Sequence, residues 1–589
     1  MRRFVVGFFA AIGLVVVLTG VGLGVALWQL AESKPDLPAT IVLDADLSRG
    51  LAEGPGDDTL SKLAFGSKPT LRGFLDALAR AADDPHVKGL YARLGGDTLG
   101  LATCQEVRDA VRAFRANGKF AIGFADSFGE FGPGTRSYYL ATAFDEIWLQ
   151  PLGSLGLIGL RSETPFFRGT LDKLGIAPDF AHREEYKTAA NPLTETAMTE
   201  PQREQVEDLL NASETQIVRG IADARNLPPD QVEALIDRGP FVADEALAAH
   251  LVDRLGYRDE AVARAREKAG AGAKLVLLSR YLDGAGKPHD SGPKIALIYG
   301  AGLITAGGGS GSSLVGVAEF TARKTGRAFR QAIDDKDVRA IVFRIDSPGG
   351  SAVASETIWR EVVRARDQGK PVIVSMGDVA GSGGYYVAVP ADKIVAEPGT
   401  LTGSIGVLAG KVVIAELLKK LGVTAASAQR GGNAGMFSEF EDFSPSGRER
   451  LNAFLDDIYR GFKAHVAAGR HLSADQVEAA AKGRVWSGEE ARAKGLIDAL
   501  GGYDAAFRLA KAAAKIPADG KFTLAVFPRE KGWIEAILDR LTNTEDEADS
   551  APPNTARGAL AQAAGLLSEL ATLASDRLVL RMPPLGEIR

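Results

Sequence analysis

Short apolar runs alternate with amphipathic stretches through most of the chain. "KIALIYG", "AIVFRID", "PVIVSMG" and "KIVAEP", all between positions 290 and 400, are rich in β-branched residues and predict buried strands. "SETIWREVVRARDQG", which starts at Ser355, has the spacing of an amphipathic helix with a serine N-cap and a terminal glycine. Repeated strand–helix alternation predicts an α/β fold.

This pattern occurs twice. "DQVEALIDRGPFVADEALAAHLVDRLGYRDEA" begins at Asp230, and the similar "DQVEAAAKGRVWSGEEARAKGLIDALGGYDAA" begins 245 residues later. Other matches lie at nearly the same offset, so chance does not explain them. We therefore predict two related domains, residues 38–265 and 290–515, with "DGAGKPHDSGP" as the linker between them.

The two ends of the chain differ from this body. Arg2 and Arg3 precede an uncharged apolar run over residues 4–30, which is long enough to span a bilayer. We predict a retained anchor over residues 1–30, with the arginines in the cytoplasm and the body in the periplasm, on the inner membrane of a Gram-negative bacterium. The alternative is a cleaved signal peptide, whose apolar region is normally shorter.

The C-terminal tail, residues 516–589, has a different composition. "TNTEDEADSAPPNTA" is acidic, polar and proline-containing, which predicts disorder. "RGALAQAAGLLSELATLASDRL" has helical apolar spacing. This helix either binds a partner or a membrane surface, or is simply solvated.

Composition excludes several function classes. The net charge of −6 and the pI of about 5.8 give no electrostatic support for binding nucleic acid. Cys104 is the single cysteine, so an intrachain disulfide or a cysteine-based zinc cluster is excluded. The six histidines show no metal-binding spacing, and there is no P-loop. We therefore predict no cofactor.

The turn "GSGGYY", with Ser382 at its second position, follows a predicted strand and precedes a helical segment. Free N–H groups at a helix N-terminus can stabilise an oxyanion. A glycine turn with a bystander serine is an equally good interpretation of the motif alone. In the first repeat, however, the counterpart is "GTRSYY", with Thr135 at this position. That asymmetry favours a nucleophile in only the second repeat.

A serine nucleophile needs a base. His182 is the only histidine near these motifs, and Lys187, in "HREEYKTAANPLTE", is the next candidate. The repeat offset places Gly432 opposite it, so the lysine is confined to the first repeat. A lysine base must be neutral, which requires burial and requires Glu184 and Glu185 to face away. The sequence alone also allows a surface lysine.

A second glycine loop, "IDSPGGSAVASE", contains Gly349 and Gly350 after a predicted strand. The first repeat keeps the pair as Gly95 and Gly96. Such a loop can offer backbone N–H groups to a carbonyl oxygen. Paired glycines after a strand are common, so this motif does not by itself identify a site.

Together, "DSPGG", "GSGGYY", "LTGSIGV" and "EYK" closely resemble the long, duplicated Ser–Lys signal peptide peptidases, also called protease IV, over residues 1–515. The resemblance implies tandem Clp-protease/crotonase-like domains behind a membrane anchor. It implies a homotetrameric serine endopeptidase that degrades signal peptides and other extended apolar peptides. The remaining alternatives are a crotonase-like acyl-transfer enzyme, against which Lys187 and the predicted anchor argue, and a non-catalytic membrane scaffold.

The resemblance also implies residue roles. The serine of "SGGYY", Ser382, would be the nucleophile, and the lysine of "EYK", Lys187, the general base. Ser404, in "TGSIG", would hydrogen-bond that lysine. Gly383 and the Gly349–Gly350 loop would form the oxyanion hole.

Overall fold

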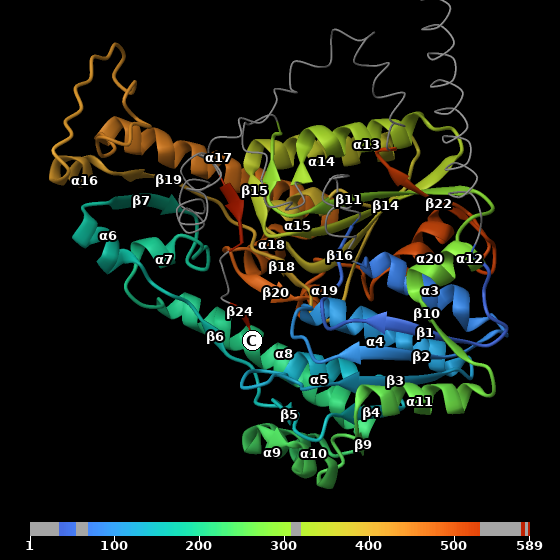
Figure 1. The fold of residues 1–589 in the computed structure, drawn as a ribbon. Coiled ribbons are helices and arrows are strands. Elements are labelled where there is room, and N and C mark those ends of the chain that lie inside the picture. Colours follow the sequence, from blue (N-terminus) through green and yellow to red (C-terminus); the bar gives the residue numbers. More distant parts are fainter. Residues whose placement is uncertain (1–34, 55–68, 308–319, 530–578, 583–586, 589) are drawn as a thin grey trace, which may run out of the picture.

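Two sheets, one from each half of the chain, form the centre of the molecule (Figure 1). The computed structural model describes residues 35–54, 69–307, 320–529, 579–582 and 587–588. The predicted anchor at residues 4–30 and most of the tail lie outside these ranges. Within the described ranges, no helix is both long enough and apolar enough to cross a membrane.

The first sheet is entirely parallel and belongs to the N-terminal half. Its strands, in spatial order, are β10 (Lys274–Leu277), β1 (Ile41–Asp46), β2 (Val87–Leu94), β3 (Phe120–Ala125), β4 (Glu146–Leu149) and β9 (Arg254–Leu255). Helices α3 (Leu71–Ala82), α4 (Leu101–Ala116) and α5 (Thr135–Ala141) connect the central strands. The strand–helix alternation predicted from the sequence is therefore present.

The second sheet repeats this arrangement in the C-terminal half. Its main path is β20 (Val485–Ser487), β18 (Leu401–Gly403), β16 (Val372–Gly381), β14 (Val338–Ser347), β11 (Lys294–Ala301) and β22 (Thr523–Phe527). In addition, β17 (Lys393–Ala396) pairs with β16, and β21 (Ala499–Leu500) pairs with β17. The four predicted strands are β11, β14, β16 and β17, so the α/β prediction is confirmed. The exact domain boundaries stay a prediction.

The predicted helix in the second repeat begins earlier than expected. Helix α14 (Ala352–Asp367) is capped by Ser351, whose Oγ accepts a hydrogen bond from the Ala354 N–H at 3.3 Å. Ser355, the predicted cap, lies inside the first turn and donates to the Ser351 carbonyl at 2.8 Å. The helix therefore begins after Ser351, directly behind the glycine loop, and not at Ser355 four residues later.

The two halves share a core. Helix α20 (Tyr503–Ala513), near the end of the second repeat, buries Tyr503 and Phe507 in the same cluster as Phe74 and Phe114 of the first repeat. Arg344 on β14 is 1% exposed and bonds Glu106 of α4 at 2.9 Å. The repeats are therefore joined by apolar packing and by a buried ion pair.

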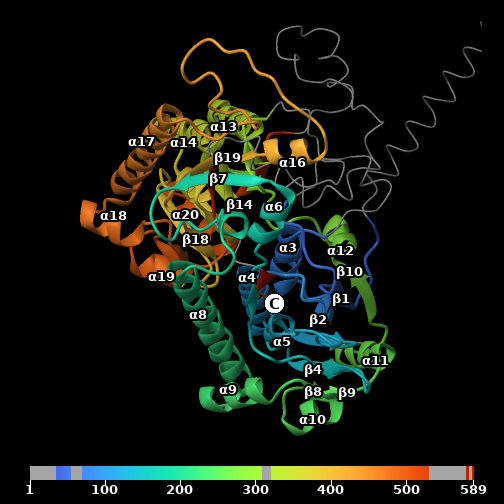
Figure 2. The same cartoon turned by 90° about the vertical axis from the view of Figure 1, so that its left-hand side faces the viewer.

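A third sheet mixes distant parts of the chain. Its order is β13 (Phe320–Thr321), β12 (Ile304–Thr305), β15 (Gly349–Ser351), β23 (Val579–Arg581), β19 (Leu408–Val413) and β7 (Ala177–His182). Strand β7 belongs to the first repeat and lies antiparallel to β19 of the second, as Figures 1 and 2 both show. The first repeat thus adds an edge strand to a sheet of the second repeat, the same sheet that contains the glycine loop of β15.

Candidate active site

Ser382 stands at the junction between β16 and helix α15 (Gly383–Ala388). Its φ of 53° lies in a region that few non-glycine residues adopt. Backbone hydrogen bonds hold it there, because its N–H donates to the Gly403 carbonyl and its carbonyl accepts from Tyr386, both at 2.8 Å. The strand–turn–helix context predicted for "GSGGYY" is confirmed.

The glycine after the serine is needed for space. A Cβ on Gly383 would lie 2.7 Å from the Ser355 Oγ and 3.1 Å from both the Gly349 Cα and the Gly350 nitrogen. The three glycines that were predicted to form the oxyanion hole, Gly383, Gly349 and Gly350, therefore lie close together in space. The Gly349 N–H, however, donates to the Ser347 Oγ at 3.1 Å.

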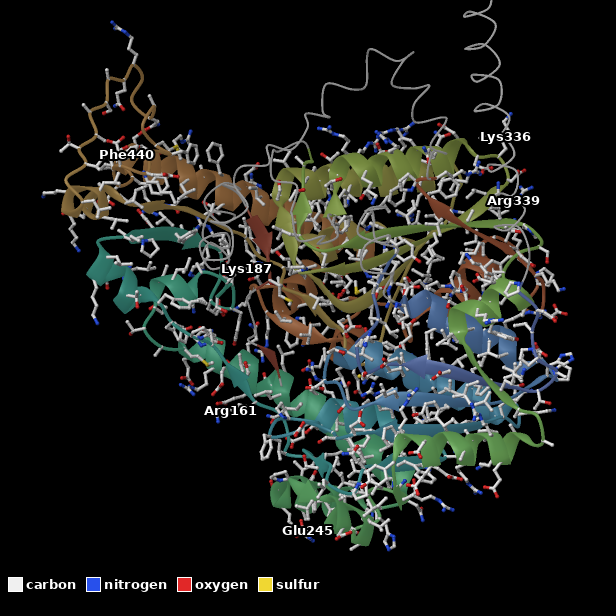
Figure 3. The ribbon with its side chains drawn as sticks, in the orientation of Figure 1. Arg161, Lys187, Glu245, Lys336, Arg339 and Phe440 are labelled. Atoms are coloured by element: carbon white, nitrogen blue, oxygen red, sulfur yellow. The ribbon has the colours of Figure 1, made fainter. Side chains whose placement is uncertain are left out.

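Lys187 reaches Ser382 from the other repeat. Its Nζ lies 2.7 Å from the Ser382 Oγ, 2.9 Å from the Ser404 Oγ and 3.0 Å from the Ser404 carbonyl oxygen. All three residues are 0% exposed. Figure 3 shows Lys187 in the interior, whereas Lys336 and Arg339 lie at the edge of the molecule. The surface-lysine alternative is therefore wrong.

Burial holds the pKa of Lys187 well below its usual value of 10.5. Glu185, which would oppose this shift, is exposed and its Oε1 lies 3.2 Å from the Lys482 Nζ. Among the described residues, the hydrogen bonds of the Lys187 Nζ go only to Ser382 and Ser404. The first condition for a neutral lysine, burial, is therefore met, and neither Glu184 nor Glu185 is among the hydrogen-bond partners of the amine.

The backbone around Lys187 is docked on the second repeat. Strand β7 pairs with β19 from Ala177 to His182, and the next N–H, that of Arg183, donates to the Val407 carbonyl at 2.9 Å. The Tyr186 N–H then donates to the Lys482 carbonyl at 3.1 Å. At Gly483, a Cβ would lie 2.5 Å from the Lys187 nitrogen. This close approach, at a φ of 78°, explains why a glycine is required there.

The C-terminal strand β23 lies along the glycine loop. It is antiparallel to β15, with Gly349 opposite Arg581 and Gly350 opposite Leu580, and Leu408 of β19 pairs with Val579 on its other side. The Met582 N–H donates to the Pro348 carbonyl at 2.6 Å. The sequence analysis did not predict this strand, because only the three residues Val579–Arg581 form it and so short a pairing is fixed by tertiary contacts.

Met582 is 6% exposed and packs against Leu209 and Val485. A Cβ on Gly381, the residue before Ser382, would lie 2.7 Å from the Met582 Sδ. Met582 thus belongs to a small apolar cluster next to the candidate nucleophile. Leu209 comes from helix α8 (Glu200–Arg225) of the first repeat, so both repeats contribute to this cluster as well.

At the corresponding turn, which the structure describes, the first repeat does not form an equivalent dyad. At its corresponding turn, the Thr135 Oγ1 donates to the Gly159 carbonyl at 2.9 Å. Arg136, in the place of Gly383, forms an ion pair with Asp97 at 3.1 Å. Gly432, in the place of Lys187, is exposed. The predicted asymmetry between the repeats is therefore present in the structure.

Comparison with known proteins gives the family. The sequence profile described as "Peptidase family S49" matches residues 132–272 and 364–517, one segment in each repeat. The chain belongs to peptidase family S49. It is 32% identical to "Serine protease SPPA, chloroplastic" of Arabidopsis thaliana, over 81% of this chain and 70% of that protein. It is 30% identical to "Protease 4" of Salmonella typhi, over 90% of this chain and 86% of that protein.

These relatives confirm the resemblance seen in the sequence: this S49 member is a serine peptidase. Among solved structures, a mutant of the "1510-N membrane-bound stomatin-specific protease" covers 41% of this chain and 100% of that one, at 18% identity and a TM-score of 0.26. A TM-score this low does not establish a shared arrangement, so the Clp-protease/crotonase-like part of the fold prediction stays a proposal.

Proposed function

We propose that Ser382 and Lys187 form the catalytic dyad of this peptidase. The observation that carries the proposal is the distance of 2.7 Å between the Lys187 Nζ and the Ser382 Oγ, with both residues fully buried. A neutral amine has two N–H groups and one lone pair. The carbonyl and hydroxyl of Ser404 accept the two N–H groups, which leaves the lone pair directed at Ser382. Ser404 is thus a positioning residue.

The reaction follows from this arrangement. Lys187 takes the hydroxyl proton while the Ser382 Oγ attacks the peptide carbonyl carbon, and the C–O bond forms as the carbonyl becomes an oxyanion. The N–H group of Gly383, with the Gly349–Gly350 loop beside it, would stabilise that oxyanion. The oxyanion collapses, the C–N bond breaks, and Lys187 returns its proton to the amine. Water, deprotonated by Lys187, then hydrolyses the acyl-serine.

The substrates we propose are signal peptides and other extended apolar peptides. Two observations support an extended apolar substrate: β15 and β19 accept an antiparallel strand between them, and Met582 packs in an apolar cluster beside Ser382. One relative carries the name "Putative signal peptide peptidase SppA". We also propose that residues 4–30 anchor the protein in the bacterial inner membrane and that it forms a homotetramer.

Active-site labelling tests the dyad. The Ser382→Ala and Lys187→Ala variants are each expected to lose at least about 10³-fold in kcat/KM on an apolar fluorogenic peptide, as expected when an acid–base group or a nucleophile is removed. A fluorophosphonate probe should label the wild type but not Ser382→Ala. Thr135→Ala, at the corresponding turn of the first repeat, is the matched control and should keep activity. Wild-type cleavage by either dyad variant would show that the assignment is wrong.

A further inference from the structure

A cavity of about 810 Å³ lies at the first repeat's counterpart of the catalytic turn. It is bounded by Asp97 after the Gly95–Gly96 pair, by Arg136 at the start of α5, and by α8. This volume is typical of ligand sites. Its wall is largely apolar, with side chains from both repeats: Leu99, Leu101, Leu160, Ile217, Val379 and Leu401.

Of the four charged side chains that line the cavity, three have polar partners, and the fourth, Glu130, is exposed. Arg136 pairs with Asp97 at 3.1 Å. Asp378 accepts hydrogen bonds from the Thr103 N–H at 2.9 Å and from the Thr103 hydroxyl at 2.6 Å. An entering ligand therefore meets apolar side chains more than free charge, which favours an apolar occupant.

The cavity lies close to the catalytic site. Val379 lies three residues before Ser382 on β16, and Leu401 three residues before Ser404 on β18, so each is roughly 10 Å from the dyad along its strand. Both line the cavity and also pack against the cluster that holds Met582. Helix α8 makes the same connection, because Leu209 contacts Met582 whereas Ser213 and Ile217, one and two turns further on, line the cavity.

The described C-terminal residues indicate the direction in which a peptide bound beside Ser382 would continue. Strand β23 ends beside Ser382 at Arg581, followed by the buried Met582. Five positions beyond Met582, β24 (Glu587–Ile588) pairs antiparallel with β6 (Ser162–Glu163), two residues from the cavity residue Leu160. Figures 1 and 2 place the C-terminus in this region of the first repeat. A chain in the strand position therefore continues, in its C-terminal direction, toward the first repeat.

We propose that the cavity of the first repeat is a second peptide-binding site, which holds the apolar segment C-terminal to the residues bound at Ser382. This inference rests on the proposed function of Ser382. It assigns to the first repeat a binding role in addition to supplying Lys187. Long apolar peptides would then be bound at two places at once, and short peptides only at the dyad.

Two peptides and one cavity variant test this. Ser213 is 8% exposed on the cavity face of α8, and Ser213→Tyr fills the path between Leu209 and Ile217. The probes are a fluorogenic apolar peptide that ends at the reporter after the scissile bond, and a quenched apolar peptide with eight residues after that bond, which span up to roughly 26 Å. Thr215→Tyr, on the exposed side of the same helix, is the control.

Ser213→Tyr is expected to lower kcat/KM for the long peptide about tenfold, equivalent to about 1.4 kcal/mol, and to leave the short peptide within about twofold of wild type. Thr215→Tyr should change neither. An equal loss on both peptides, or no loss on the long one, would overturn the second site. The Ser382→Ala variant distinguishes failure of the proposed dyad from failure of the proposed second site. If Ser382→Ala still cleaves both peptides, the dyad assignment is wrong, whatever the result for Ser213→Tyr.

Discussion

Lys187 is placed where a lysine is unfavourable unless it gives up its proton. Its Nζ is fully buried, and the groups that bond it, Ser382 and Ser404, are neutral. Burial without a counter-charge lowers the pKa of an amine, and the same effect links folding to pH. The protonation of Lys187 therefore also affects the free energy of unfolding, so its neutral state can be tested without an activity assay.

Replacing Lys187 with Met should change how stability depends on pH. The folded-state pKa of Lys187 lies below the unfolded value of about 10.5, so between these two values the unfolded chain binds one proton more. The free energy of unfolding of the wild type should therefore rise with pH relative to Lys187→Met, by up to about 1.4 kcal/mol per pH unit. Urea unfolding of both proteins from pH 6 to 9.5 measures this difference.

The exposed Lys336, changed to Met, is the control for this experiment. The difference between wild type and Lys187→Met should flatten at pH values below the folded pKa, where both states bind the proton. A difference that stays constant from pH 6 to 9.5 would mean that Lys187 is charged in the folded enzyme. In that case it would not be the base.

At the scale of elements, the pairing of β7 with β19 positions Lys187 next to Ser382. Six residue pairs, from Ala177–Val413 to His182–Leu408, attach the first repeat to the second just before Lys187. In the middle of this ladder, Gly410 faces Phe180, and a Cβ on Gly410 would lie 2.3 Å from the Asp179 carbonyl oxygen. The approach of the two strands thus depends on a glycine that lies far from the dyad in sequence.

Gly410→Val should therefore displace β7 and, with it, Lys187. Overpacking of this kind typically costs about 1–3 kcal/mol. We expect kcat/KM to fall at least about tenfold, because small displacements of a base have large effects. Gly432→Val, at an exposed glycine with no atom within 4 Å of its added Cβ, should have no effect. Circular dichroism checks that both variants are folded, and a fully active Gly410→Val would contradict the positioning role of β7.

Much of this arrangement was predictable from the sequence, because the two repeats can be compared with each other. The strands β11, β14, β16 and β17 follow from apolar runs, and the division of Ser382 and Lys187 between repeats follows from comparing the copies. The third sheet was not predictable. Its strands β12, β15 and β23 have only two or three residues each, and such short pairings are fixed by tertiary contacts, not by local pattern.

On the scale of the whole molecule, the repeats are linked by a buried ion cluster. Arg344, inside the apolar run of β14, contacts Glu106 at 2.9 Å and Glu53 at 2.5 Å, and its guanidinium lies 4.4 Å from the centre of the Tyr503 ring. Both carboxylates come from the first repeat. Burial raises the pKa of Glu106, against the influence of Arg344.

Arg344→Met should leave the buried Glu106 without its cation and destabilise the protein by about 3–5 kcal/mol in urea unfolding. Because the folded-state pKa of Glu106 is raised, this carboxyl binds more protons in the folded protein than in the unfolded chain, so the loss should shrink as the pH falls. Adding Glu106→Gln to Arg344→Met should recover part of the stability. The exposed Arg339→Met is the control. An Arg344→Met variant as stable as wild type would show that this ion cluster does not help to hold the repeats together.

Strand β23 occupies the position between β15 and β19 in which we propose that a substrate binds. Because β23 is part of the same chain, it competes with substrate at an effective concentration that depends on the tether and not on dilution. The apparent KM is then the intrinsic value multiplied by one plus the equilibrium constant for docking β23, whereas kcat at saturation is unaffected. A chain that ends at residue 578 lacks β23 and Met582, so its KM for an apolar peptide should fall while kcat stays the same. Steady-state kinetics decide this, and an unchanged or higher KM would contradict it. With β23 in place, the peptidase would respond to how well a peptide displaces a strand, so weakly bound peptides would escape cleavage even when abundant.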